Sequence, residues 1–155
     1  MNSQFIQSVL WGGLSAGVLD ITAACGQAAW RNGSGPLRVF QSVAGGWLGV
    51  ATFQGGWKTA ALGLALHFLI ATVWAAVYSL ISLQWPVWRQ SALLSGLLYG
   101  SLVYLFMYGM VLPLSAYHTK FFNQRVGLLL SNWLIHLICV GVPIALAAKR
   151  FLKTE

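Results

Sequence analysis

A long uncharged run limits the possible folds more than any other feature of the sequence. No charged residue occurs between Lys58 and Arg89, and the stretch from Thr59 to Leu83 is mostly apolar. About 20 such residues cross a hydrocarbon layer of roughly 30 Å as one helix. The sequence therefore predicts an all-α membrane protein. We expect four transmembrane helices in one integral membrane domain over residues 1–155, with spans at about 5–30, 59–83, 91–114 and 126–148.

The composition excludes a water-soluble globular domain. Only 7% of the residues are charged and 58% are hydrophobic, whereas a soluble domain carries about 25% charged residues. The net charge of +7 comes from Lys and Arg that lie mostly between or after the apolar runs, as they do around membrane helices. No arginine-rich patch with interleaved aromatic residues is present, so we expect a lipid bilayer and no nucleic acid as the partner.

A shorter amphipathic segment separates the first two spans. Residues 36–49 begin with Pro36, which suits the first turn of a helix. Apolar residues, including Phe40 and Trp47, recur at helical spacing. Arg38, Gln41 and Ser42 occupy the other side. We expect a helix that lies in the interface or re-enters the membrane, and a fifth crossing over residues 36–56 is the alternative.

Three titratable residues are predicted to lie at one depth in the membrane. Counted from the helix ends at 1.5 Å per residue, Asp20, His67 and His136 sit roughly 12–15 Å below the same surface. Tyr104 and Tyr108 bracket that depth on the third span. Gln27 shares a helical stripe with Asp20. We expect Asp20, His67, Tyr104, His136 and Gln27 to form a buried polar layer.

The free-energy cost of an ionised carboxylate in lipid explains why Asp20 is expected to have a polar partner. Such a group at a helix centre costs about 2.5–3.5 kcal/mol on insertion scales. No Lys or Arg shares the depth of Asp20, so a histidine is the available partner. We predict a hydrogen bond between Asp20 and a histidine, made directly or through water.

Two pairs of glycines have the spacing of close helix contacts. Gly13 and Gly17 in the first span, and Gly96 and Gly100 in the third, follow the small-xxx-small pattern of membrane helix packing. Each pair precedes a span that carries a histidine, which suggests a parallel internal repeat. The alternative is chance similarity between apolar helices.

These features favour a channel- or transporter-like protein that handles protons, small ions or a small polar solute. The first alternative is a non-transporting subunit or assembly factor that binds another membrane protein or lipid through residues 36–49. The second is a haem- or metal-binding membrane protein using His67, His136 and Asp20. We expect no enzyme, no cofactor and no metal, because Asp20 and Glu155 are the only acids and cannot form a general acid–base pair. A homo-oligomer is expected, because four short helices offer little internal volume around a polar layer.

Several short sequence motifs resemble those of small bacterial inner-membrane proteins of the YagU-like family. They are Gly13-x-x-x-Gly17-x-x-Asp20, Pro36-Leu37-Arg38-Val39-x-Gln41-Ser42-Val43-Ala44, Gly63-Leu64-x-x-His67-Phe68 and Leu112-Pro113-Leu114-Ser115. The resemblance implies helical architecture and a bacterial inner (cytoplasmic) membrane, and it transfers no catalytic residues.

Overall fold

The computed structural model describes residues 3–116, 118 and 125–152. Among these residues, four helical spans are long and apolar enough to cross a membrane: Ser3–Asn32, Gly56–Gln84, Ala92–Leu114 and Val126–Phe151. A shorter helix lies between the first and second of them. The predicted fold class, an all-α membrane protein with four spans and an intervening helix, is confirmed.

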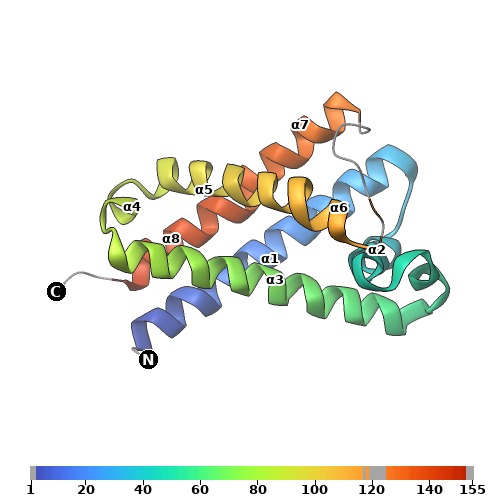
Figure 1. Ribbon diagram of the computed structural model, residues 1–155, viewed down its shortest axis with the longest axis horizontal. Coiled ribbons are helices and arrows are strands. Elements are labelled where there is room, and N and C mark those ends of the chain that lie inside the picture. Colours follow the sequence, from blue (N-terminus) through green and yellow to red (C-terminus); the bar gives the residue numbers. More distant parts are fainter. Residues whose placement is uncertain (1–2, 117, 119–124, 153–155) are drawn as a thin grey trace.

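The elements follow one another as α1 (Ser3–Asn32), α2 (Pro36–Leu48), the 3₁₀ segment η1 (Gly49–Gln54), α3 (Gly56–Gln84), α4 (Val87–Gln90), α5 (Ala92–Phe106), the π-helical segment η2 (Met107–Val111), α6 (Leu112–Leu114), α7 (Val126–Ile135), the π-helical segment η4 (His136–Gly141) and α8 (Val142–Phe151). Both chain ends lie at one end of the bundle, and α2 lies at the other end, where α3 begins (Figure 1). The chain therefore crosses four times and returns to the side where it started.

The third and fourth spans each contain a π-helical segment that the sequence analysis did not predict. Proline removes one backbone donor and clashes with the carbonyl four residues earlier. For Pro113 that carbonyl belongs to Gly109 in η2, and for Pro143 it belongs to Cys139 in η4. A π turn accommodates the ring without ending the helix. The two prolines were therefore the available sequence signal.

Glycines bring the spans together in pairs. A Cβ on Gly13 would lie 2.7 Å from the Thr72 Cα, and a Cβ on Gly17 would lie 2.6 Å from the Phe68 ring, so α1 packs closely on α3 at both positions. In the same way, a Cβ on Gly100 would lie 2.8 Å from the Leu137 Cα, where α5 meets η4.

Gly96 extends this second contact. A Cβ there would lie 2.8 Å from the Val142 Cα, where α5 meets α8. The spans therefore associate as α1 with α3 and α5 with η4–α8, and the backbones approach closely because these positions carry no side chain.

The end of the bundle that holds the chain termini is closed by tyrosines. The Tyr78 hydroxyl donates to the Trp88 carbonyl at 2.9 Å, and it hydrogen-bonds the Ser95 hydroxyl at 2.8 Å. The Tyr99 hydroxyl donates to the Trp74 carbonyl at 2.7 Å. These rings pack with small residues of α1, α3 and α8 into the buried core. The hydroxyls of both tyrosines are thus satisfied within this half of the bundle.

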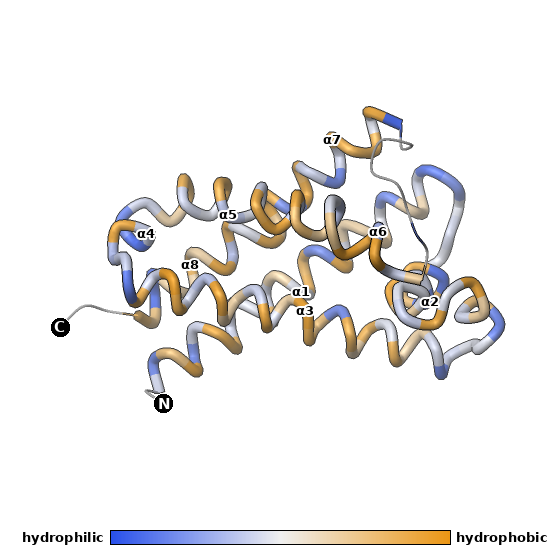
Figure 2. The backbone as a smooth tube through the Cα atoms, viewed as in Figure 1, coloured by the Kyte–Doolittle hydropathy of each residue, from blue (hydrophilic) through white to orange (hydrophobic). Residues whose placement is uncertain are grey.

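Large apolar side chains face outward along the spans, as expected for helices surrounded by lipid. Exposed leucines occur on every one of the four spans. The more hydrophilic residues gather mainly toward the two ends of the bundle (Figure 2). This distribution places the hydrocarbon layer around the middle of the bundle and supports integral membrane location.

Helix α2 has only 13 residues, a length of roughly 20 Å, and the backbone leaves the helical conformation at Gly49 (φ 67°), where η1 begins. Residues 36–56 thus form no continuous helix long enough for the alternative of a fifth crossing. Its Phe40 carbonyl contacts Gly63 of α3 at the position where a Cβ would stand. Arg38 is exposed and its guanidinium lies 4.7 Å from the centre of the Phe53 ring. Trp47 is 71% exposed and Pro36 is also exposed.

The assignment of Gln41 to the polar, outward side of α2 was wrong. This residue is only 4% exposed. Its side-chain amide donates to the Gly56 carbonyl at 3.1 Å and to the Thr59 hydroxyl at 3.3 Å. A buried amide is stable when such partners satisfy it, so Gln41 fixes the corner between α2 and α3.

Candidate functional site: a cavity around Asp20

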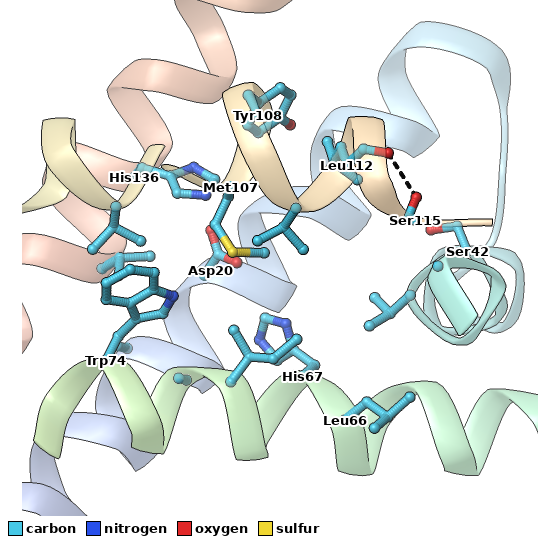
Figure 3. Close-up of a pocket in the computed structure, with 18 of the residues that line it drawn as sticks. Asp20, Ser42, Leu66, His67, Trp74, Met107, Tyr108, Leu112, Ser115 and His136 are labelled. Atoms are coloured by element: carbon cyan, nitrogen blue, oxygen red, sulfur yellow. Dashed lines mark hydrogen bonds between the residues drawn. The ribbon is translucent and has the colours of Figure 1, made fainter. Parts of the chain in front are cut away.

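A cavity of about 460 Å³ lies among the spans next to α2. It is bounded by α1, α3, the η2–α6 segment and η4, with residues of α2 at one end (Figure 3). Ligand pockets usually have about 300–1,000 Å³ and mostly apolar walls. Most of its lining is apolar, and its polar side chains are those of Asp20, Ser42, His67, Tyr108, Ser115 and His136.

Asp20 is the only acidic residue in the lining. Its side chain comes from α1 and points into the cavity between those of His67 and His136 (Figure 3). In the part of the chain that the structure describes, no residue hydrogen-bonds or forms an ion pair with this carboxylate, and no Lys or Arg lines the cavity. Among the described residues, this carboxylate thus has no neutralising cation.

The ring of His67 is fixed by a bond between two spans. Its Nε2 lies 2.9 Å from the Gly17 carbonyl oxygen of α1. Because a carbonyl oxygen only accepts, Nε2 carries the hydrogen and donates. The absence of a side chain at Gly17 lets α3 come close enough for this contact. His67 therefore connects α3 to α1 one helical turn from Asp20.

His136 sits at the start of the π-helical segment η4. Its Nδ1 donates to the Asn132 carbonyl at 2.8 Å within the same span, which leaves Nε2 available as the second ring nitrogen. The Tyr104 and Tyr108 rings pack edge-on against it, with centroids 5.5 and 5.9 Å away. In Figure 3 this ring and the Asp20 carboxylate point toward one another.

Two details of the predicted polar layer are corrected by these contacts. Asp20, His67 and His136 are half-buried, so the layer is not sealed inside the protein. The direct hydrogen bond between Asp20 and a histidine is not formed, because the described contacts of both rings are to backbone carbonyls. Backbone carbonyls close to the two rings compete with the Asp20 carboxylate for the ring N–H groups. The distance of these carbonyls from the rings is determined by how the helix backbones pack.

Tyr104 and Gln27 lie outside the cavity lining. Tyr104 is 3% exposed, and its hydroxyl donates to the Leu129 carbonyl at 3.0 Å. Gln27 donates to the Ser131 hydroxyl at 2.8 Å and so connects α1 to α7. In the described contacts both residues hold helices together.

Trp74, Met107 and Tyr108 are among the lining residues that the predicted layer did not include. Tyr108 follows Tyr104 by four positions, so the helical stripe on the third span was the available signal. Trp74 follows His67 by seven positions on α3, two helical turns farther along the same face.

The alternative of a metal-binding protein requires a cluster of ligating side chains. Within the described residues, no three His, Cys, Asp or Glu side chains are grouped closely enough to hold a metal ion. The proposed ligands Asp20, His67 and His136 share a cavity without converging on one point. A haem between the two histidines stays an untested alternative, and a Soret band would be its signature.

The fold defines a polytopic α-helical membrane protein. Its cavity is lined by one carboxylate, for which the described residues supply no cation. Comparison of the chain with protein-family models, curated proteins and solved structures returned no match. The resemblance to the YagU-like family is therefore supported only at the level of a small four-span helical membrane protein.

Proposed function

We propose that this protein is channel- or transporter-like and handles protons, small ions or a small polar solute at the cavity around Asp20. One observation carries the proposal: the Asp20 carboxylate, on a helix apolar enough to cross a membrane, faces a cavity, and no described residue supplies the opposite charge. Ionisable groups inside a membrane are unfavourable unless they are paired, hydrated or protonated. A carboxylate that lacks a fixed cation can exchange a mobile one.

The surroundings of Asp20 suit such an exchange. The carboxylate accepts a proton or attracts a cation, and the second nitrogen of His136 offers a further proton acceptor beside it. His67 is held by its bond to the Gly17 carbonyl, so its role is to position α3 relative to α1. Ser42 and Ser115 lie at the α2 end of the cavity and provide hydroxyls along a polar route.

Flux measurements in proteoliposomes test the proposal. With a pH-sensitive dye enclosed and an imposed pH gradient, the wild type should accelerate the decay of the gradient. The Asp20→Asn variant keeps the side-chain shape and removes the charge, and we expect the flux to fall by about tenfold or more, equivalent to at least about 1.4 kcal/mol.

Thr22→Val is the matched control for this experiment. Thr22 is exposed on the same helix, and its hydroxyl donates only to the Val18 carbonyl. This variant should retain wild-type flux. Equal flux for wild type and Asp20→Asn would rule out a role of the carboxylate in proton transport.

The proposal includes that the protein forms a homo-oligomer and lies in a bacterial inner membrane. The membrane rests on the resemblance alone. A single chain already forms the 460 Å³ cavity, so the cavity itself requires no second copy. We expect mass measurement by light scattering in detergent, corrected for bound detergent, to give a multiple of 16.8 kDa. A mass of one chain at all detergent concentrations would contradict the oligomer.

The second candidate is a non-transporting subunit that binds lipid or another membrane protein through α2. It is favoured by the apolar side chains at the end of α2 and in η1, where Trp47 is 71% and Val50 is 76% exposed. Exposed tryptophan also suits the headgroup zone of a bilayer. Absence of any flux, combined with an unchanged Asp20→Asn phenotype, would favour this candidate.

A further inference from the structure

We propose that the ligand of the cavity is a small organic monocation with an apolar body, such as a substituted ammonium ion. This inference rests on the proposed function, because it names the class of solute handled at Asp20. It follows from three properties of the cavity: its single negative charge, its shortage of oxygen ligands and its aromatic and apolar walls.

The charge of the cavity lining suits a ligand that carries one positive charge. Asp20 is the only carboxylate, and no Lys or Arg is present in the described lining to repel a cation or neutralise the acid. A monocation would therefore restore neutrality at this depth. An anionic ligand would face an uncompensated carboxylate, and a divalent cation would leave excess positive charge in a low-dielectric site.

The oxygen atoms are too few for a bare inorganic ion. Magnesium and calcium require six or more oxygen ligands in a compact shell. Here the Asp20 carboxylate and the hydroxyl of Tyr108 come from different spans, while Ser42 and Ser115 lie toward α2. Moreover, the Ser115 hydroxyl donates to the Leu112 carbonyl at 2.7 Å. A strongly hydrated ion would lose water without gaining an equivalent shell.

The aromatic rings suit a weakly hydrated organic cation instead. Cations within about 6 Å of a tryptophan or tyrosine ring are attracted to its face. Trp74 and Tyr108 line the cavity with Asp20. Trp74 is held edge-on against Phe106, with centroids 5.3 Å apart, and its carbonyl accepts the Tyr99 hydroxyl. Its ring is thus positioned before a ligand arrives, which reduces the entropy lost on binding.

The remaining wall accommodates an apolar body. Leu66, Ile70, Val103 and Leu112 line the cavity alongside the charged end. The volume of about 460 Å³ lies in the range of small-molecule pockets. Apolar surface transferred from water to these side chains would stabilise binding by roughly 25 cal/mol per Å².

The experiment compares a cation with its uncharged isostere. Binding of benzyltrimethylammonium and of neopentylbenzene, in which a carbon replaces the charged nitrogen, is measured by equilibrium dialysis on the full chain in nanodiscs, with empty nanodiscs subtracted. We expect the wild type to bind the cation at least about tenfold more tightly than the isostere. Asp20→Asn should remove that preference while binding of the isostere is retained.

A pair of tryptophan variants tests the aromatic wall. Trp74→Leu should weaken binding of the cation more than binding of the isostere. Trp30→Leu is the matched control, because Trp30 is 91% exposed on α1, and it should leave both affinities unchanged. If Trp74→Leu disturbs the fold, the Asp20→Asn comparison still decides the question, because that variant preserves side-chain volume.

The outcomes separate this inference from the proposed function. Failure of benzyltrimethylammonium to bind, or equal binding of cation and isostere, would overturn the inference even where proton flux depends on Asp20. Binding that prefers the cation and depends on Asp20, without any proton flux, would support the ligand class and overturn proton transport. Binding that survives Asp20→Asn unchanged would place the cation elsewhere and also overturn the inference.

Discussion

Gly141→Val should prevent the third and fourth spans from packing together. A Cβ at Gly141 would clash with the Gly96 carbonyl oxygen and would lie 2.6 Å from the Gly100 backbone nitrogen. All of these are backbone atoms of α5, so no side-chain rotation relieves the clash. Overpacking of a close contact typically destabilises by 1–3 kcal/mol. Here we expect on the order of 3 kcal/mol or more, because an entire helix must move.

Thermal unfolding in detergent, followed by tryptophan fluorescence, measures this effect. Gly26→Ala is the matched control, because a Cβ at Gly26 meets nothing within 4 Å. Alanine suits a helix better than glycine, so the control should stabilise by about 0.4–1 kcal/mol. Equal stability of Gly141→Val and wild type would show that α5 and η4 are farther apart than described.

Gly63→Val should detach α2 from α3 while the four spans remain folded. The Phe40 carbonyl of α2 occupies the position of the added Cβ, and the Ala44 nitrogen would lie 3.0 Å away. Movement of α2 would also break the bonds of Gln41 to the Gly56 carbonyl and the Thr59 hydroxyl. We expect the amides of α2 to lose protection from hydrogen exchange by about 100-fold, equivalent to about 2.8 kcal/mol.

Hydrogen exchange resolved by mass spectrometry checks this expectation peptide by peptide. Gly46→Ala is the control on α2 itself, because its Cβ would approach only the Ser115 Cβ, at an ordinary contact distance of 3.9 Å. Its α2 amides should keep wild-type protection. Loss of protection throughout all four spans of Gly63→Val would mean that α2 is required for the whole bundle, contrary to our expectation.

Three residues that the sequence analysis grouped together line the same cavity. Helical rise and distance from the helix ends predicted one depth for Asp20, His67 and His136, and all three line the cavity. Their hydrogen-bond partners did not follow from the sequence. His67 bonds the Gly17 carbonyl and His136 bonds the Asn132 carbonyl, and these choices depend on interhelical distances and on a π turn. Tyr104 was selected by depth, yet the side chain that reaches the cavity is Tyr108.

The sequence by itself determined that lipid surrounds the protein and that four helices are long enough to span the membrane. Span length and apolar content are sums over neighbouring residues, so they do not depend on how the helices pack. The tertiary structure alone decided that Gly141 is the third glycine of the α5–η4 contact, that Gln41 points inward, and that a cavity surrounds Asp20. These outcomes depend on which atoms of distant segments meet. A clash or a hydrogen bond changes over a few tenths of an ångström, a distance that no local residue pattern specifies.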